Sequence, residues 1–152
     1  MSARILHPTD FSAASAPAFR RAVAEARSTR GELLLVHVLA PVVPIVSADA
    51  YLSPRTYQDM SASARRWGRK ELDRLVARAR AARVRARGIL LEGVAHERIV
   101  REARARRAGL IVMGTHGRTG LAGFFLGSVA ARVAALAPCP VLTVRSGRRR
   151  TV

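Results

Sequence analysis

Glycine residues recur at defined intervals in one stretch of the sequence, between Gly114 and Ser128. Gly114 has no Cβ, so a ligand could approach its backbone closely, and Gly117 could adopt the positive φ that aims successive amides at an anion. Gly127 and Ser128 precede a helical pattern, whose first amides lack intrahelical partners and whose dipole is positive at that end. These residue types predict a phosphate site built mainly from backbone. The alternative is that the glycines only close a long connection.

Short apolar runs alternate with helical patterns around this stretch. The continuous apolar run 33–38 is typical of a strand buried on both faces of a parallel sheet. The predicted strands are residues 4–8, 33–38, 84–91, 110–113 and 141–144. The predicted helices are a segment before Gly31 with Ala16, Phe19, Val23 and Ala26 on one face, and residues 61–82, 97–107 and 128–136. This alternation predicts an α/β domain: a doubly wound, five-stranded parallel sheet with helices on both faces.

The second helical segment follows a proline-containing stretch. The prolines between residues 41 and 57 predict a surface loop, with the helix starting near Ser61. Its apolar and small residues are expected to face the core and its arginines the solvent; the inward set is Ala64, Trp67, Leu75 and Ala79.

Ligands of an open parallel sheet bind outside the carboxyl ends of its strands, where the strand order reverses. The first predicted strand is followed by Thr9 and Asp10, the second ends at Val38, and the fourth leads into the glycine-rich stretch. Asp10 or Ser12 could also cap the helix that follows. A ligand site is therefore expected where these three segments meet.

Length and composition fit a soluble domain. The chain has 152 residues, 49% of them apolar, which is enough for one core. We expect the domain to cover residues 1–146 and an Arg-rich tail to cover residues 147–152. The single cysteine, Cys139, excludes an internal disulfide and favours a reducing compartment. The apolar stretch 33–46 is too short to span a membrane and is interrupted by His37, Pro41 and Pro44, so we expect a cytoplasmic protein.

The net charge of +17 has two interpretations. Such a field attracts polyanions, nucleic acid included. Alternatively, the arginines occupy solvated helix faces. We favour the second interpretation, because the basic residues are spread through the predicted helices.

Taken together, these motifs resemble the universal stress protein family. The spacing of Gly114, Gly117 and Gly127-Ser128 matches that family's nucleotide-binding signature. Further matches are the opening Ile5-Leu6-His7-Pro8-Thr9-Asp10-Phe11-Ser12, the strand 33–38, the segment 110–118 and the ending Ala137-Pro138-Cys139-Pro140-Val141-Leu142-Thr143-Val144. The resemblance covers nearly the whole chain and implies a Rossmann-like fold of the adenine-nucleotide alpha hydrolase type.

The resemblance also implies ATP as the ligand, and it leaves open whether Mg²⁺ or Mn²⁺ accompanies it. Asp10 would accept hydrogen bonds from the ribose and the backbone of Val38 would contact the adenine. The residues that would line or bind the nucleotide are Pro8, Thr9, Asp10, Val38, Met113, Gly114, His116, Gly117, Arg118, Gly127, Ser128 and Val129. His116 and Arg118 could equally be surface groups.

No catalytic residue is expected. The glycine-rich stretch lacks the lysine and carboxylate of common ATP hydrolases, and His116 is its sole candidate base. Cys139 lies between two prolines and is expected to be a packed thiol, not a nucleophile partnered with His37 or His96. We therefore expect a nucleotide-sensing regulatory or stress-resistance protein that hydrolyses ATP slowly or not at all.

A homodimer is the expected assembly. The last predicted strand comprises Val141, Leu142, Thr143 and Val144; it is apolar and would lie at a sheet edge, where it could pair with its copy. Two alternatives to a nucleotide sensor remain: an interaction module that works without nucleotide, and a polyanion or nucleic-acid binder that uses the +17 charge.

Overall fold

Five parallel strands form one sheet in the computed structural model, which describes residues 3–41, 53–116 and 126–147. The strand order is β3-β2-β1-β4-β5. The strands are β1 (Arg4–Pro8), β2 (Glu32–Leu39), β3 (Arg85–Glu92), β4 (Leu110–Gly114) and β5 (Val141–Val144). The helices are a 3-10 turn η1 (Ala13–Ser15) and α1 (Ala16–Ser28), α2 (Pro54–Ala81), α3 (Ala95–Ala105) and α4 (Ser128–Leu136). The predicted doubly wound sheet is confirmed.

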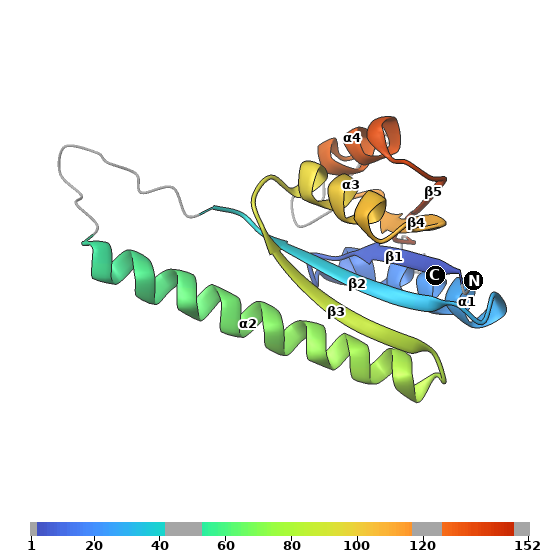
Figure 1. Ribbon diagram of the computed structural model, residues 1–152, viewed down its shortest axis with the longest axis horizontal. Coiled ribbons are helices and arrows are strands. Elements are labelled where there is room, and N and C mark those ends of the chain that lie inside the picture. The colour runs from blue at the N-terminus through green and yellow to red at the C-terminus, as the bar shows by residue number, and fades with distance from the viewer. Residues whose placement is uncertain (1–2, 42–52, 117–125, 148–152) are drawn as a thin grey trace, which may run out of the picture.

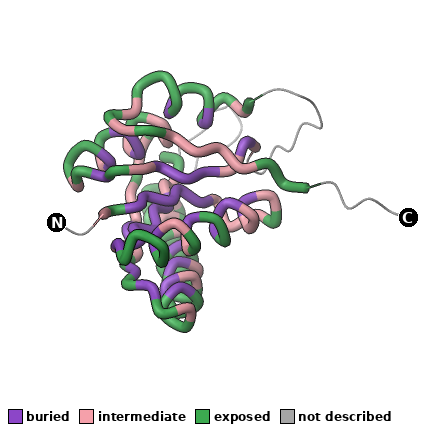
Figure 2. The backbone as a smooth tube through the Cα atoms, turned by 90° about the vertical axis from the view of Figure 1, so that its right-hand side faces the viewer, coloured by how far each residue is buried: buried purple, intermediate pink, exposed green. Residues whose placement is uncertain are grey.

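Helices cover both faces of the sheet (Figure 1). One apolar cluster packs α1 and α2 against one face and includes Phe19, Leu33 and Leu72. The other packs α3 and α4 against the opposite face and includes Leu34, Ile99 and Val133. Alternate residues of β2 thus enter different clusters, as expected for a strand covered on both sides. Figure 2 shows the buried residues concentrated along the strands and the helix sides that face them.

The predicted element bounds are close to the observed ones, except at α2. The bounds of β1, α4 and β5 match the prediction. The prediction of a loop through residue 57 and a helix start near Ser61 was wrong, because α2 begins at Pro54. Ser53 caps the helix, with its Oγ accepting the amide of Thr56 at 3.2 Å, and Pro54 at the first helical position needs no amide partner. The serine-proline pair was the signal for this helix start.

The predicted burial of Trp67 was also wrong, since its side chain is 42% exposed. Its ring nevertheless contacts two other rings edge-on, those of Phe11 at 5.4 Å and His37 at 5.8 Å between centroids. The position toward the core is taken by its neighbour Gly68, at which a Cβ would lie 3.0 Å from a methyl carbon of Leu90. Trp67 therefore sits at the border between the core and the solvent.

Three helices end in the same way, with an arginine in the left-handed region. Arg30, Arg83 and Arg107 follow α1, α2 and α3 with φ of 51°, 61° and 52°. In each case the next amide donates to a carbonyl five residues earlier, for example Ala108 to Ala103 at 2.9 Å. This bonding is that of the Schellman motif, in which glycine is the usual residue at the left-handed position. These left-handed conformations cost free energy, because the Cβ of an L residue makes them unfavourable.

The strand order reverses between β1 and β4. The chain moves from β1 outward through β2 to β3, and then crosses to β4 and β5 on the other side of β1. The carboxyl ends of β1 and β4 consequently lie side by side with no helix between them. The segments that follow these two strands contain most of the predicted site residues.

Candidate functional site

The turn after β1 is held by its own side chains. Thr9 is buried, and its Oγ1 accepts the amide of Phe11 at 3.0 Å. Asp10 Oδ1 accepts the amide of Ser12 at 2.9 Å. These two bonds support the left-handed backbone of Phe11, whose φ is 63°. The carboxylate of Asp10 therefore has a fixed position beside the carboxyl end of the sheet, and it supports the chain ahead of η1 without capping α1.

The end of β2 is tied to this turn. His37 Nδ1 lies 2.8 Å from the carbonyl oxygen of Thr9, and its ring stacks on Phe11 with centroids 4.4 Å apart. Val38, the next residue, packs on the opposite face of the sheet with the α3–α4 cluster. The contact between His37 and Thr9 thus places the backbone of Val38 next to the Asp10 turn.

The end of β4 lies against the segment after Asp10. Met113 is buried in the α3–α4 cluster. A Cβ on Gly114 would lie 3.3 Å from the carbonyl oxygen of His116 and 3.7 Å from that of Ala14. The absence of a side chain at Gly114 therefore permits η1 and the chain after β4 to approach each other.

The start of α4 returns to the same place. The amide of Gly127 donates to the carbonyl oxygen of Thr115 at 2.7 Å, and a Cβ on Gly127 would lie only 2.9 Å from that oxygen. Any larger residue would displace backbone here. The contact closes the connection between β4 and α4, and brings the first turn of α4 to the end of β4.

The first turn of α4 is exposed, and its amides have no intrahelical acceptors. Ser128 and Val129 are exposed residues of this turn. The amide of Gly127, in contrast, is occupied by Thr115. His116 is half-buried, with its Nδ1 3.0 Å from Thr115 Oγ1. The phosphate-binding prediction is thus best supported, among the described residues, at Ser128 and Val129.

The structure brings most of the predicted site residues to one edge of the sheet. Pro8 ends β1, and Thr9 and Asp10 follow it. Val38 is the next-to-last residue of β2. Met113 and Gly114 are the last two residues of β4, His116 lies just beyond it, and Gly127, Ser128 and Val129 lie at the start of α4. Gly117 and Arg118 lie outside the described residues. Sequence analysis missed three residues that support the site, namely Phe11, Ser15 and His37, whose contacts depend on folding. Ser15 Oγ, for example, lies 3.3 Å from Thr9 Oγ1.

Burial shifts the pKa values of two titratable groups near the sheet, His7 and Cys139. Burial lowers the pKa of His7 to about 4, although its contact with the carbonyl of Val112 and the charge of Asp10 oppose that effect. Burial raises the pKa of the Cys139 thiol. Cys139 is half-buried and packs against the α3–α4 cluster, and a thiol with a raised pKa holds little thiolate at neutral pH.

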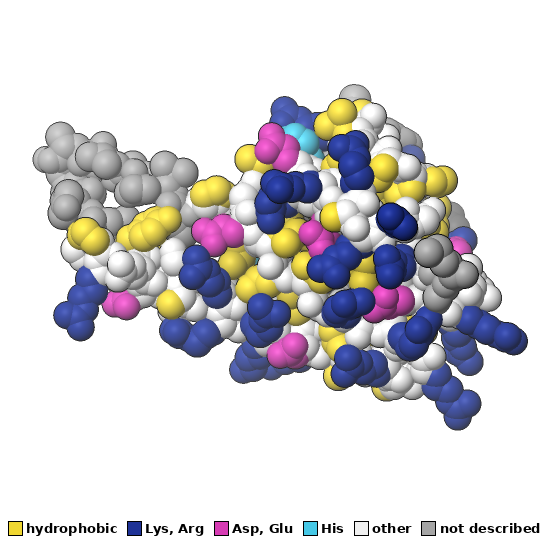
Figure 3. Space-filling model, viewed as in Figure 1, with side chains coloured by type: hydrophobic (Ala, Val, Ile, Leu, Met, Phe, Trp, Pro, Cys, Tyr) yellow, Lys and Arg dark blue, Asp and Glu magenta, His cyan; other side chains and the backbone are white. Residues whose placement is uncertain are grey.

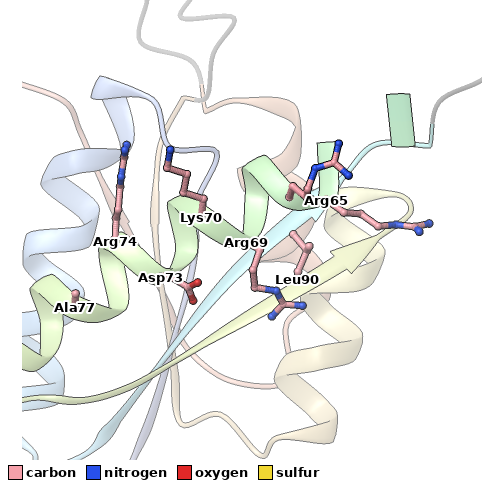
Figure 4. Close-up of a pocket in the computed structure, with 8 residues that line it drawn as sticks. Arg65, Arg69, Lys70, Asp73, Arg74, Ala77 and Leu90 are labelled. Atoms are coloured by element: carbon pink, nitrogen blue, oxygen red, sulfur yellow. The ribbon is translucent and has the colours of Figure 1, made fainter. Parts of the chain in front are cut away.

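A surface hollow of about 770 Å³ lies on α2, away from the predicted site. Figure 4 shows its lining side chains on successive turns of the helix, with Lys70 and Arg74 extending to one side and Arg69 and Asp73 to the other. Side chains that diverge in this way form an open surface and do not enclose a small molecule.

Neither a metal centre nor a membrane-spanning helix is found in the part of the chain that the structure describes. In residues 3–41, 53–116 and 126–147, no group of three or more histidine, cysteine or acidic side chains is placed to hold a metal ion. No helix in the same part of the chain is both long enough and apolar enough to cross a membrane.

Comparisons with known proteins agree on one family. The model of the universal stress protein family matches residues 1–145. A universal stress protein of Methanocaldococcus jannaschii, MJ0531, is 36% identical over 146 residues, which cover 96% of this chain and 84% of that protein. A universal stress protein of Thermus aquaticus is 40% identical over 124 residues, covering 82% and 85% of the two chains.

Solved structures share the fold. The M. jannaschii protein MJ0577 superposes with a TM-score of 0.83 at 26% identity, covering 97% of this chain and 99% of that one. Two more distant structures are an Archaeoglobus fulgidus universal stress protein in complex with dAMP and an Arabidopsis thaliana family protein with AMP bound. The A. fulgidus structure has a TM-score of 0.64 at 20% identity, covering 95% of this chain and 98% of that one. The A. thaliana structure has a TM-score of 0.67 at 22% identity, covering 99% of this chain and 95% of that one.

Proposed function

Because this chain belongs to the universal stress protein family, we propose that it binds ATP at the edge where β1 and β4 end. The observation that carries the proposal is the close approach of Gly127 to Thr115: a Cβ on Gly127 would lie only 2.9 Å from the Thr115 carbonyl oxygen. This contact brings the exposed first turn of α4 to the ends of β1 and β4. An anion there would accept the amides of Ser128 and Val129 without any lysine. More distant members of the fold were solved with dAMP and with AMP, both adenine nucleotides.

The residues present fit both parts of a nucleotide, the nucleoside and the phosphates. Asp10 would accept the ribose hydroxyls; a carboxylate has about four acceptor sites, so the bond from Ser12 does not prevent this. The backbone of Val38, which His37 holds near the Asp10 turn, would meet the adenine. Pro8, Thr9, Met113 and Gly114 would form the wall between the base and the phosphates. Gly117 and Arg118 are further proposed phosphate contacts, and for these two residues the proposal rests on the sequence alone.

We expect little or slow hydrolysis. A hydrolase for ATP needs a group that orients water and charge that stabilises the departing phosphate, often with a metal held by a carboxylate. Residues 114–129 contain no lysine and no acidic residue. Binding without turnover suits a sensor: ATP would connect the Asp10 turn to α4, and stabilise whichever state of the protein binds it better.

The proposed sensor is a cytoplasmic homodimer that pairs through β5. This strand is at the edge of the sheet, as predicted, and its four residues are uncharged and half-buried. The other edge strand, β3, carries Arg85 and Arg87, whose charges oppose pairing with a second copy. The difference between the two edges favours β5 as the interface.

Titration calorimetry with ATP tests the proposed function. Wild type is expected to bind ATP, and Gly127→Ala to bind it on the order of tenfold more weakly, a loss of about 1.4 kcal/mol, because the added Cβ displaces Thr115. The matched control is Gly147→Ala, since nothing lies within 4 Å of a Cβ at Gly147. Heat-released nucleotide from purified protein gives a second measurement. Absence of ATP binding by the folded wild type would leave the interaction module as the better interpretation.

A further inference from the structure

An exposed aromatic ring lies within a basic stretch of α2. The stretch reads Arg65-Arg66-Trp67-Gly68-Arg69-Lys70, and the Trp67 side chain is 42% exposed. The rings of Phe11 and His37 hold the indole from the protein side.

Cations follow Trp67 along the same side of the helix. Lys70, Arg74 and Arg78 come three, seven and eleven residues after it, so each successive turn presents one basic group on this side. Figure 4 shows Lys70 and Arg74 extending in the same direction. The guanidinium of Arg78 lies 4.9 Å from the centroid of the Phe19 ring of α1, and Arg78 is exposed. From Trp67 to Arg78 this stacking row, as we call these four residues, is about 16 Å long at 1.5 Å per helical residue.

Little negative charge opposes the stacking row. Residues 65–87 hold ten basic and two acidic side chains. Arg74 pairs with Glu71 at 2.9 Å, but this pair is exposed and such pairs contribute little. Lys70 has no carboxylate within ion-pair distance in the described part of the chain. Figure 3 shows Lys and Arg side chains outnumbering acidic ones over the visible face of α2 and β3.

We propose that the stacking row binds single-stranded nucleic acid, with a base stacked on Trp67 and phosphates at Lys70, Arg74 and Arg78. A row of cations alone would attract any polyanion. An exposed indole adds a surface on which an unpaired base can stack, and a duplex has no unpaired bases to offer. An anionic membrane fits less well, because the apolar side of α2 is used for the core: Leu72, Val76 and Ala79 are buried against the sheet. This inference is independent of ATP binding.

Intrinsic fluorescence tests the stacking directly, because Trp67 is the only tryptophan. An oligothymidylate of about 12 nucleotides, within the range of known single-strand sites, is expected to quench it on binding. The affinity should fall steeply with salt. Trp67→Ala should lower the affinity about tenfold or more, as measured by the anisotropy of labelled oligonucleotide, and Trp67→Phe should retain most of it. Circular dichroism verifies that both variants fold.

A charge-matched pair of variants separates the stacking row from net charge. Lys70→Ala/Arg74→Ala should weaken binding on the order of tenfold and reduce the salt slope by about 1.4, since each lost phosphate contact is worth about 0.7. Arg101→Ala/Arg104→Ala removes the same charge from exposed positions of α3, on the opposite face of the sheet, and should change the affinity less than about twofold.

Four results would overturn the proposal. Equal losses in the two double variants would mean that net charge alone attracts the oligonucleotide, and binding without quenching of Trp67 would exclude stacking. Competition by saturating ATP would place the oligonucleotide in the nucleotide site instead. Tighter binding to vesicles of anionic phospholipid than to the oligonucleotide would identify a membrane surface as the partner.

Discussion

The Nδ1 atom of His7 lies 2.8 Å from the carbonyl oxygen of Val112, and this contact joins the central strand β1 to its neighbour β4. The ring is fully buried. Because a carbonyl oxygen only accepts, the neutral ring holds its proton on Nδ1. Its Nε2 has no hydrogen-bond partner among the described residues. Protonation of Nε2 would place a charge in the core without a partner.

Acid should therefore destabilise the protein through His7. Above pH 6.5 the ring is neutral in both the folded and unfolded states. Between pH 6.5 and about 4 the unfolded chain binds a proton that the folded protein does not, so the free energy of unfolding falls as the pH falls. The loss should approach about 3 kcal/mol and then level off. Urea unfolding at a series of pH values measures it.

The matched variant is His7→Leu, which cannot titrate. Its stability at neutral pH is expected to be lower, because the carbonyl of Val112 loses its partner. Its stability between pH 6.5 and 4 should nevertheless fall less steeply than that of the wild type. Parallel pH profiles would show that His7 does not control acid stability.

Asp10 should recognise the ribose of a bound nucleotide. Wild type is expected to bind ATP more tightly than 2′,3′-dideoxy-ATP, by about tenfold for hydrogen bonds to a charged group. In Asp10→Asn, which keeps an oxygen for the amide of Ser12, this ratio should shrink toward one. Calorimetry with both nucleotides and both proteins measures how strongly the Asp10 side chain and the ribose hydroxyls depend on each other for binding. A ratio unchanged in the variant would remove Asp10 from the ribose site.

Glycine should stabilise the end of α3. Arg107 is held at a φ of 52°, which costs an L residue about 1–2 kcal/mol. Arg107→Gly should therefore raise the free energy of unfolding by about 0.5–1 kcal/mol. Arg101→Gly, inside the same helix, should lower it by about 1 kcal/mol. Urea unfolding measures both, and two changes of the same sign would contradict the argument.

A proline in β5 should prevent dimer formation while preserving the sheet. The carbonyl of Pro140 accepts the amide of Ile111 in β4, and that of Val144 accepts the amide of Thr115, which follows β4. In a parallel pair the backbone of Thr143, between these positions, is therefore directed to the open edge. Thr143→Pro removes one outward donor and should yield a monomer by light scattering. Thr143→Val retains the donor and should stay dimeric. A dimer that persists in the proline variant would exclude pairing through β5.

The sequence was sufficient for most of the fold. Apolar runs and helical periodicity are local, so they located the five strands and four helices, with Ser128–Leu136 and Val141–Val144 at their observed bounds. The sequence pattern does not predict the start of α2, because several prolines indicate a loop there, whereas a proline such as Pro54 is also favoured at the first position of a helix.

The chemistry of the site was predicted as residue types, and its geometry was not. The spacing of Gly114, Gly127 and Ser128 predicts a phosphate-binding stretch from the sequence alone. That Gly127 meets Thr115 at 2.7 Å, that His37 holds Thr9 at 2.8 Å and that Trp67 is exposed were decided by tertiary packing. Contacts between residues 12 or more positions apart depend on how strands and helices are arranged in space, and local patterns contain no information about that arrangement.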